Sequence, residues 1–445
     1  MTGISSFGGL NIALRGLLAQ QRALDVTSHN IANVDTPGYS RQEAVLAAAP
    51  ALVIDAGALQ LGAGAQLGQG VDVLAYRRIR DDFLDLQWRA QNMTGGQADV
   101  TAQRLGQVQD ALADGTDADL GKLLDNFWTA WQTLASNPQS GSAQSGVVAA
   151  ATTLAQGFQS LDSQWSTLAA QSTTAVGDLL GAQGPIKPIA DELAKLNVAI
   201  NHAQTAGVAP NDLLDRRDLL LDQLSRYGQV SVTPDPTLDG SGNPMYPGMI
   251  QVTFGGATTP LVSQGTVTMP TAADLSATPG GTIGGLQDVA ARVAGYGTTL
   301  GAIAAQLIGD VNAASPSPIF SGTGATDIAV VATPSTVTAG TGAAGDTSVA
   351  MAIARMRSGT VDQGYAGLVR TIGGDVSNAT AAQATSTAVL GSLTERRDAT
   401  AGVSMDEEMA NMIRFQRGYQ AAARMLTTMD EAIDTIINRT GRVGL

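Results

Sequence analysis

The stretch VSMDEEMANMIRFQRGYQAAARMLTTMDEAIDTII, residues 403–437, decides the fold. Its apolar residues recur at alternating steps of three and four, which is the spacing of a heptad seam along one long helix. Ser404 stands at the N-cap position with Glu407 three residues later, so the two form a capping box, and further acids follow in the first turn. The seam consists of Met412, Phe415, Tyr419, Ala422, Leu426, Met429, Ile433 and Ile436. A lone helix with such an exposed stripe buries too little to stay ordered, so the sequence predicts a partner helix.

The partner helix is expected at the other end of the chain. A matching heptad grid of apolar residues is formed by Leu10, Leu14, Leu17, Leu24 and Ile31. This helix is expected to stop at Asp35-Thr36-Pro37-Gly38, because Pro37 has no amide hydrogen and Gly38 can adopt a left-handed turn. We therefore predict that residues 1–45 and 400–445 pair as a terminal coiled-coil domain.

A resemblance to a known family begins at this turn. The run NIANVDTPGYSRQ, residues 30–42, resembles the signature shared by the axial rod, hook and hook-associated proteins of the bacterial flagellum. The motif residues are Asn30, Asn33, Thr36, Pro37, Gly38, Tyr39, Ser40, Arg41 and Gln42. Hook and rod members continue with Gly-Phe-Lys, whereas the ending from Gly38 to Gln42 is similar to the hook-associated members. Residues 403–426, FWTAWQTLASNPQ (127–139) and LLDRRDLLLDQLS (213–225) extend the likeness.

The resemblance implies a function without catalysis. It implies a structural component at the hook-filament junction that assembles through its terminal helices, with identical subunits in a ring, hook protein and the next hook-associated junction protein as neighbours. It also implies an extracellular location, export from the cytoplasm without a cleaved signal peptide, and a cytoplasmic export chaperone at the C-terminal helix. A hook or rod axial subunit is the alternative within the family, and it is disfavoured by the motif ending and by the long helical middle region.

Composition excludes several other classes. The chain has 445 residues and a formal net charge of −14, which disfavours binding to a phosphate backbone, so no nucleic acid partner is expected. It has no cysteine, so disulfides and thiolate metal sites are excluded. No run of about 18 strongly apolar residues is present, so no membrane span is expected, and we find no signal-peptide pattern. The three arginine pairs at 77–78, 216–217 and 396–397 are interpreted as solvated helix faces.

The middle of the chain predicts a helical shaft and a small β part. Residues 46–228 and 286–399 form the predicted shaft. Residues 45–75 are interpreted as a connector with a short strand at residues 70–74, and a helix from Arg77 pauses at Gly95-Gly96. Residues 229–285 contain short runs separated by turn residues and predict a small β domain. Residues 319–345 are β-like, and their allegiance to the β domain or to the shaft stays open. The predicted fold is mainly α with a smaller β part, an elongated hairpin with the β insert at its tip.

Candidate catalytic and metal-binding residues are few. His29 and His202 are the two histidines, and neither lies in a cluster at ligand spacing, so both are interpreted as surface or packing residues. The loop from Asp235 to Tyr246 lacks the bidentate glutamate of a calcium loop and is interpreted as a hairpin turn. Asp406, Glu407 and Glu408 are explained by the helix dipole. No cofactor, metal or catalytic residue is assigned. A secreted hydrolase with a site in the β region is the alternative from another class, disfavoured because that region has no histidine and few acids.

Overall fold

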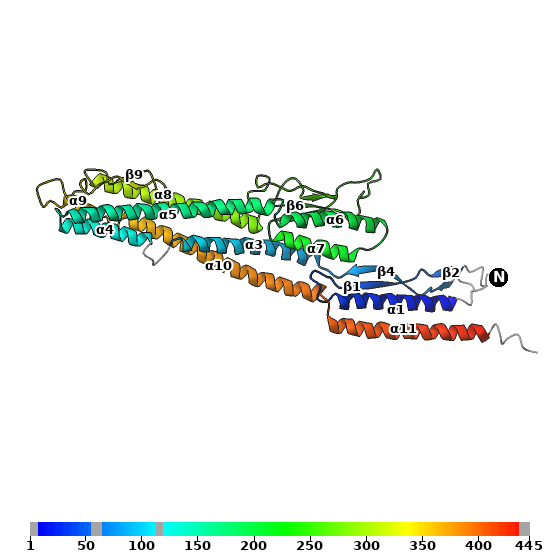
Figure 1. Ribbon diagram of the computed structural model, residues 1–445. Coiled ribbons are helices and arrows are strands. Elements are labelled where there is room, and N and C mark those ends of the chain that lie inside the picture. The colour runs from blue at the N-terminus through cyan, green and yellow to red at the C-terminus, as the bar shows by residue number, and fades with distance from the viewer. Residues whose placement is uncertain (1–7, 55–64, 113–118, 436–445) are drawn as a thin grey trace, which may run out of the picture.

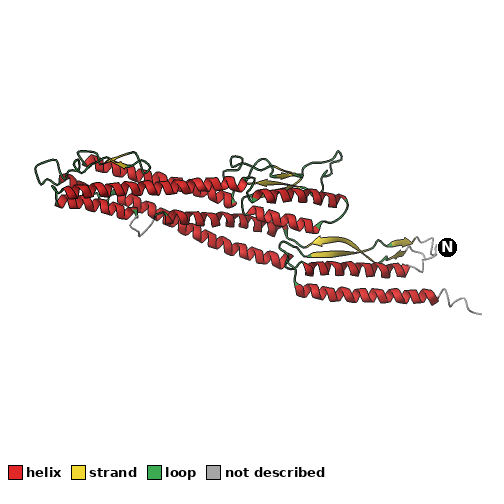
Figure 2. Ribbon diagram, in the orientation of Figure 1, coloured by secondary structure: helices red, strands yellow, loops and turns green. Residues whose placement is uncertain are grey.

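A computed structural model of the protein describes residues 8–54, 65–112 and 119–435. Figure 1 shows an elongated molecule, and Figure 2 shows that helices dominate it. The prediction of a mainly α fold with a smaller β part is confirmed. In the described part of the chain, no helix combines the length and the apolar character needed to cross a bilayer.

One end of the molecule is a terminal module made from both ends of the described chain (Figure 1). It contains helices α1 (Gly8–Ala32) and α11 (Met405–Asp434), the paired strands β1 (Gln42–Ala48) and β4 (Val71–Arg78), and the paired strands β2 (Leu52–Ile54) and β3 (Ala65–Leu67). Gly9 lies against Met429, and Gln20 lies against Gly418. The two helices are therefore antiparallel neighbours.

The short strand predicted at residues 70–74 overlaps β4, but its pairing with β1 in a hairpin differs from the connector expected over residues 45–75. Its two strands are antiparallel and lie along α1, with Arg15 of α1 bound to Asp72 of β4 at 2.8 Å. The sequence of β1 is QEAVLAA, and its three alanines disfavour a strand on propensity alone. Pairing with β4 and packing against α1 override that local preference.

The shaft consists of long helices. They are α3 (Asp82–Asp110), α4 (Leu120–Ser136), α5 (Gly141–Leu180), α8 (Gly281–Ala314), α9 (Ser348–Ala354) and α10 (Thr360–Ala401). Helix α3 begins later than Arg77, because Arg77 and Arg78 belong to β4 and Asp81 caps the helix by accepting from the amides of Phe83 and Leu84. It also continues through Gly95-Gly96 without the expected pause.

The shaft core lies at the end remote from the terminal module. Phe127, Trp128 and Trp131 of α4 meet edge to face, and Phe127 also contacts Phe320. Strands β9 (Phe320–Ser321) and β10 (Ala329–Val330) pack on this core. The buried side chains of the β-like piece at residues 319–345 therefore pack with the helical shaft and not with the four-stranded sheet.

The four-stranded sheet is not at the tip. Its antiparallel order is β5 (Val230–Pro234), β6 (Ile250–Phe254), β7 (Val262–Ser263) and β8 (Thr266–Val267). Val252, Phe254 and Val262 share one core with α6 (Ile186–Thr205) and α7 (Asn211–Ser225). Figure 1 places this unit midway along the molecule, whereas α4, α9 and β9 form the far end. The expected tip position is wrong, since the alternating apolar face of β6 is buried against helices rather than carried on the end of the shaft.

Candidate functional site

The contact between α1 and α11 is made through small and polar residues on the α1 side. Gly9 approaches Met429, Gln20 approaches Gly418 and Asn30 binds Glu408, and the buried residues of α1 are Ala13, Ala19, Ala23, Thr27 and Asn30. At about 100° per residue, the predicted leucine stripe lies roughly 100° round the helix from this face, because each of its positions follows a contact position by one residue. Leu14 is 43% exposed, and Leu10, Leu17, Leu24 and Ile31 are half-buried. The structure thus brings the two helices together, but it leaves the α1 leucines beside their contact rather than at its centre.

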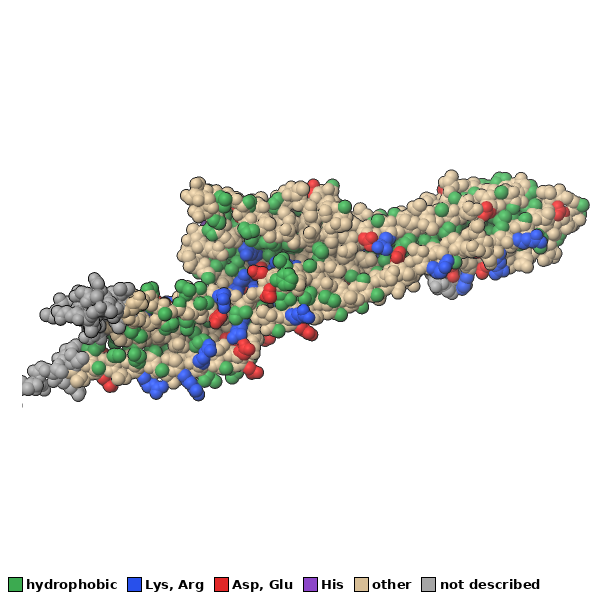
Figure 3. All heavy atoms as spheres, turned by 180° about the vertical axis from the view of Figure 1, so that it is seen from behind, with side chains coloured by type: hydrophobic (Ala, Val, Ile, Leu, Met, Phe, Trp, Pro, Cys, Tyr) green, Lys and Arg blue, Asp and Glu red, His purple; other side chains and the backbone are tan. Residues whose placement is uncertain are grey.

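The predicted seam of α11 lies partly against α1 and partly open. Met412, Phe415, Ala422, Leu426, Met429 and Ile433 are half-buried, whereas Tyr419 is 37% exposed and Ile436 lies outside the described residues. Met409 and Ile413 extend the apolar surface, at 54% and 50% exposure. Helical periodicity directs Met412, Tyr419 and Ala423 to the same side of the helix pair as the α1 leucines. Figure 3 shows apolar side chains along the terminal module. We call this open apolar side of α1 and α11 the terminal face.

The motif loop after α1 has backbone requirements that explain its residue types. Asn33 donates from its side chain to the His29 carbonyl at 3.0 Å, and the Thr36 hydroxyl donates to Asn33 Oδ1 at 3.1 Å. Gly38 has a φ of 80°, and a Cβ there would lie 3.0 Å from Leu219 of α7. A side chain at position 38 would therefore be strained and crowded at once.

Asn30, Tyr39 and Gln42 tie this loop to the helix that precedes it. Asn30 donates to the Gln42 carbonyl at 2.9 Å and to Glu408 at 3.2 Å, while its Oδ1 accepts from the Gln42 amide at 3.0 Å. The Tyr39 hydroxyl donates to the same Oδ1 at 2.8 Å and lies 3.0 Å from His29 Nδ1. Burial, with the carboxylates of Asp212, Asp215 and Glu408, raises the pKa of Tyr39, so its hydroxyl remains a donor.

Arg41 joins the motif loop to the start of α11. Its guanidinium binds Glu407 at 2.6 Å and Glu408 at 2.7 Å, and Glu408 is only 2% exposed. Ser404 does cap α11, since its hydroxyl accepts from the Glu407 amide at 3.5 Å. The helix dipole alone was therefore an incomplete explanation of the acidic trio: two of its three carboxylates hold the two ends of the chain together.

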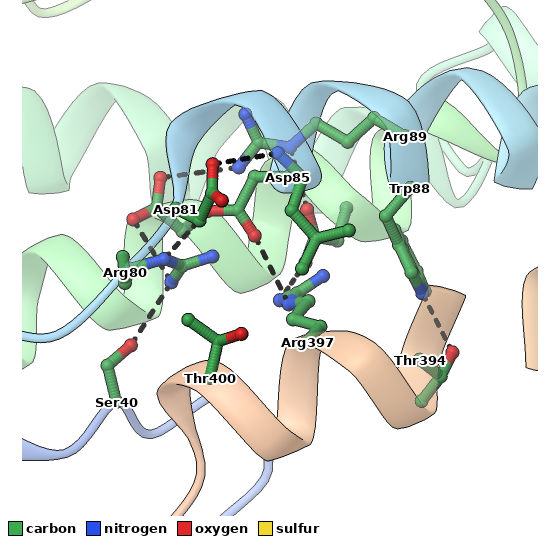
Figure 4. Close-up of polar contacts among 12 residues, drawn as sticks. Ser40, Arg80, Asp81, Asp85, Trp88, Arg89, Thr394, Arg397 and Thr400 are labelled. Carbon is green, nitrogen blue, oxygen red and sulfur yellow. Dashed lines mark hydrogen bonds and ion pairs between the residues drawn. The ribbon is translucent and has the colours of Figure 1, made fainter. Parts of the chain in front are cut away.

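A second set of charges joins the terminal module to the shaft. We call it the charged cluster; it consists of Arg78, Arg80, Arg89 and Arg397 with Asp85, Asp215, Asp218 and Asp222. Figure 4 shows part of it between α3 and α10, and Figure 3 shows charged side chains gathered where the terminal module meets the shaft. Four positive and four negative side chains are present, so the cluster is balanced.

The acids of the cluster come mainly from one face of α7. Asp215, Asp218 and Asp222 follow at steps of three and four, so they align on that helix. Arg78 reaches Asp215 and Asp218, each at 2.8 Å, and Arg89 binds Asp222 at 2.7 Å. The connections therefore run from β4 and α3 to α7.

The remaining contacts bring in α10 and the motif loop. Arg80 binds Asp85 at 2.8 Å, and Arg397 of α10 binds Asp85 and Asp222 and stacks 4.9 Å from the Trp88 ring centre. Ser40 of the motif donates to Asp215 from its amide at 3.0 Å and from its hydroxyl at 2.7 Å. Gln42 donates to Asp212 of the same helix at 2.7 Å. The motif loop, residues 33–42, is thus bound to α7 through Ser40 and Gln42 and to α11 through Arg41.

The electrostatics favour ionised side chains in this cluster. Burial raises the pKa of Asp218, but Arg80, Arg78 and Arg89 outweigh it and hold that pKa below its ordinary value. Burial also opposes the charge on Arg80, yet the hydrogen bond to Asp85 and the nearby Asp218 raise its pKa. These groups pair with one another across several elements, although Arg80 Nη2 is buried without a hydrogen-bond partner, so the arrangement fixes relative positions of elements. Among the described residues, no group of three or more histidine and acidic side chains is placed to hold a metal ion.

The sequence interpretation of the arginine pairs is partly wrong. Arg77 and Arg216 are exposed, but the side chains of Arg78 and Arg397 are only 18% and 16% exposed and belong to the charged cluster. Their partners lie more than 130 residues away in sequence. The one local signal was the run of Asp215, Asp218 and Asp222 on one face of an amphipathic helix.

Comparisons with known proteins agree with the resemblance. The family model described as the flagellar hook-associated protein FlgK helical domain matches residues 105–317. Models for the flagellar basal body rod FlgEFG protein C-terminal region and for the flagella basal body rod protein match residues 398–439 and 10–39.

Individual relatives carry the same description. Flagellar hook-associated protein 1 of Bacillus subtilis is 28% identical over 98% of this chain and 99% of its own length. The Salmonella typhimurium protein of that name is 34% identical over 50% of this chain, which spans 39% of the relative. The solved flagellar hook junction protein FlgK of Burkholderia pseudomallei aligns over 52% of this chain and 43% of its own, with a TM-score of 0.41 and 24% identity. The chain is similar to flagellar hook-associated protein 1 over nearly its whole length, and flagellar family models match its two terminal regions and its middle.

Proposed function

We propose that this protein is a structural subunit of the bacterial flagellum at the junction between hook and filament, where it assembles through its terminal face. Two observations together carry the proposal. The helices α1 and α11 have an open apolar side, and the charged cluster fixes the terminal module to the shaft. Exposed apolar surface of this extent on a soluble helix pair is typical of an interaction site.

The proposed partners follow from this location. Identical subunits form a ring, hook protein lies on one side, and the next hook-associated junction protein lies on the other. A cytoplasmic chaperone covers the C-terminal helix before export, which proceeds without a cleaved signal peptide to the extracellular flagellum. The half-buried and exposed apolar residues of α11 support a need for such cover, since they would otherwise face water.

The proposed role is mechanical and involves no catalysis. The polar side chains gathered at the motif are bonded to one another rather than turned toward a substrate. The terminal module serves assembly, the helices of the shaft set the outward reach, and the sheet of β5 to β8 reinforces the shaft beside α6 and α7.

Electron microscopy of a strain that lacks the gene tests the proposal. We expect hooks without filaments, and filaments restored by the complementing gene. Normal filaments on cells without this protein would contradict the proposed location and role. A filament defect without hooks would instead favour the hook or rod alternative.

A further inference from the structure

Two exposed apolar residues near the start of α3 have no partner within the described chain that covers them. Phe83 is 69% exposed and Leu86 is 63% exposed. They are three residues apart, so they lie together on one face of the helix. Two large side chains exposed to this degree at adjacent positions are typical of a protein contact. We call them the knob.

An open cleft lies on the opposite side of the same helix. It encloses about 470 Å³ between α3, α7, α10 and the motif loop. Trp88 and Asn92 line it from α3, and Asn92 is fixed by hydrogen bonds to Asp222 and Ser225 of α7. Phe83 and Asn92 are nine residues apart, about two and a half turns, so their side chains point in opposite directions. Figure 4 shows Trp88 and Arg397 on the cleft side, between α3 and α10.

The chemistry of the cleft fits the knob. Its apolar walls include Tyr39, Leu219 and Tyr227, which suit an aromatic and an aliphatic side chain. Three arginines and two aspartates line the cleft, so its lining has one more positive than negative side chain. Next to the knob, the exposed Asp81 and Asp82 precede Phe83 and carry the opposite charge. A volume of this size is in the range that accommodates a compact ligand or a pair of large side chains.

The positions of knob and cleft identify the occupant. The two lie within about 10 Å of one another along the axis of α3, since the midpoints of residues 83–86 and 88–92 are about one and a half turns apart. A surface and its complement on opposite sides of one molecule at one height give a head-to-tail contact, which forms a ring or a shallow helix of copies. Resting on the proposed function, we infer that Phe83 and Leu86 of one subunit enter the cleft of the next identical subunit at the junction.

Cysteine cross-linking in isolated flagella tests this contact, because the chain has no cysteine of its own. Phe83→Cys and Gln223→Cys place one thiol on the knob and one on the rim of the cleft, at exposed positions. Oxidation of the double variant should give a ladder of dimers and higher oligomers. Each single variant should remain monomeric, since neither thiol would meet its own copy in a head-to-tail contact.

A matched control uses the same rim and the same helix. Gln103→Cys with Gln223→Cys carries an exposed thiol about 30 Å further along α3, and it should give no ladder. If the Phe83→Cys and Gln223→Cys double variant assembles into flagella but forms no cross-links, the inferred contact is wrong and the proposed function still stands. Dimers of the Phe83→Cys single variant would also overturn it, because they require a two-fold contact. Absence of the protein from flagella in every variant would count against the proposed function itself.

Discussion

A single aspartate shows how the terminal module is held. Asp218 is partly buried among Arg78, Arg80 and Arg89, and its pKa is held below the ordinary 3.8 of the unfolded chain. A group whose pKa is lower in the folded state stabilises the fold fully above its unfolded pKa. That contribution is lost as the pH falls through the lower folded value. The attachment of module to shaft is therefore sensitive to acid.

Asp218→Asn should lower the free energy of unfolding by about 3 kcal/mol at pH 7, because three arginines lose a charged partner in a partly buried place. The difference from wild type should begin to narrow below about pH 5, where the carboxylate of the unfolded wild-type chain takes up protons. Denaturant titrations across pH 7 to 3.5 measure it. Asp125→Asn, on an exposed pair with Arg357, should change stability by less than about 1 kcal/mol. A constant Asp218→Asn penalty at all pH values would contradict the account.

Glu408 should fix the two ends of the chain to one another. Glu408→Gln removes the charge that binds Arg41 and weakens the bond from Asn30, so α1 and the first turns of α11 should lose about 2 kcal/mol of local stability. Amide hydrogen exchange of these segments measures the loss. Glu431→Gln, exposed on the same helix, serves as the control. Unchanged protection in Glu408→Gln would show that Arg41 does not connect the elements.

At the scale of elements, periodicity predicted the long helices and failed where distant packing decides. The apolar spacing of α5, α6 and α8 is visible locally, because each helix buries one face. Strand β1 was not expected, since its alanines carry no strand signal until β4 pairs with it. Periodicity predicted the apolar stripes of both terminal helices but not which faces meet, since α1 contacts α11 at Gly9, Gln20 and Asn30. The charged cluster could not be predicted, because its pairs join residues far apart in sequence.

Gly95 and Gly96 of α3 differ in how closely other atoms approach them, so alanine at each position tests a different effect. A Cβ at Gly96 would lie 2.1 Å from the Arg226 carbonyl oxygen, whereas at Gly95 the nearest atom is the Ser386 hydroxyl at 3.5 Å. Gly96→Ala should therefore destabilise the protein by about 1–3 kcal/mol. Gly95→Ala should stabilise it by about 0.5–1 kcal/mol, since alanine favours the helix. Thermal unfolding of both variants distinguishes them, and equal effects would contradict the observed approach of α7 to α3.

At the scale of the whole molecule, the terminal module proposed to make the subunit contacts is a separate unit from the helical shaft. The chain passes between module and shaft at only two described places, after β4 and at Gly402, and the charged cluster lies at both. Buried and paired charges tolerate few alternative arrangements, so the shaft keeps one orientation relative to the terminal face. A subunit built in this way can transmit the geometry of its ring to whatever its shaft contacts.

Two aspartate substitutions on α11 test the terminal face most directly. Tyr419 is 37% exposed and lies on the terminal face, while Ala421, two residues later, is exposed about 160° away round the helix. Each substitution adds the same charge and should change the stability of the single chain by less than about 1 kcal/mol. Tyr419→Asp would place a carboxylate in the subunit contact, at a cost of several kcal/mol per subunit, so hooks should carry no filaments. Ala421→Asp should assemble as wild type, whereas equal filament growth with both exported variants would contradict assembly through this face.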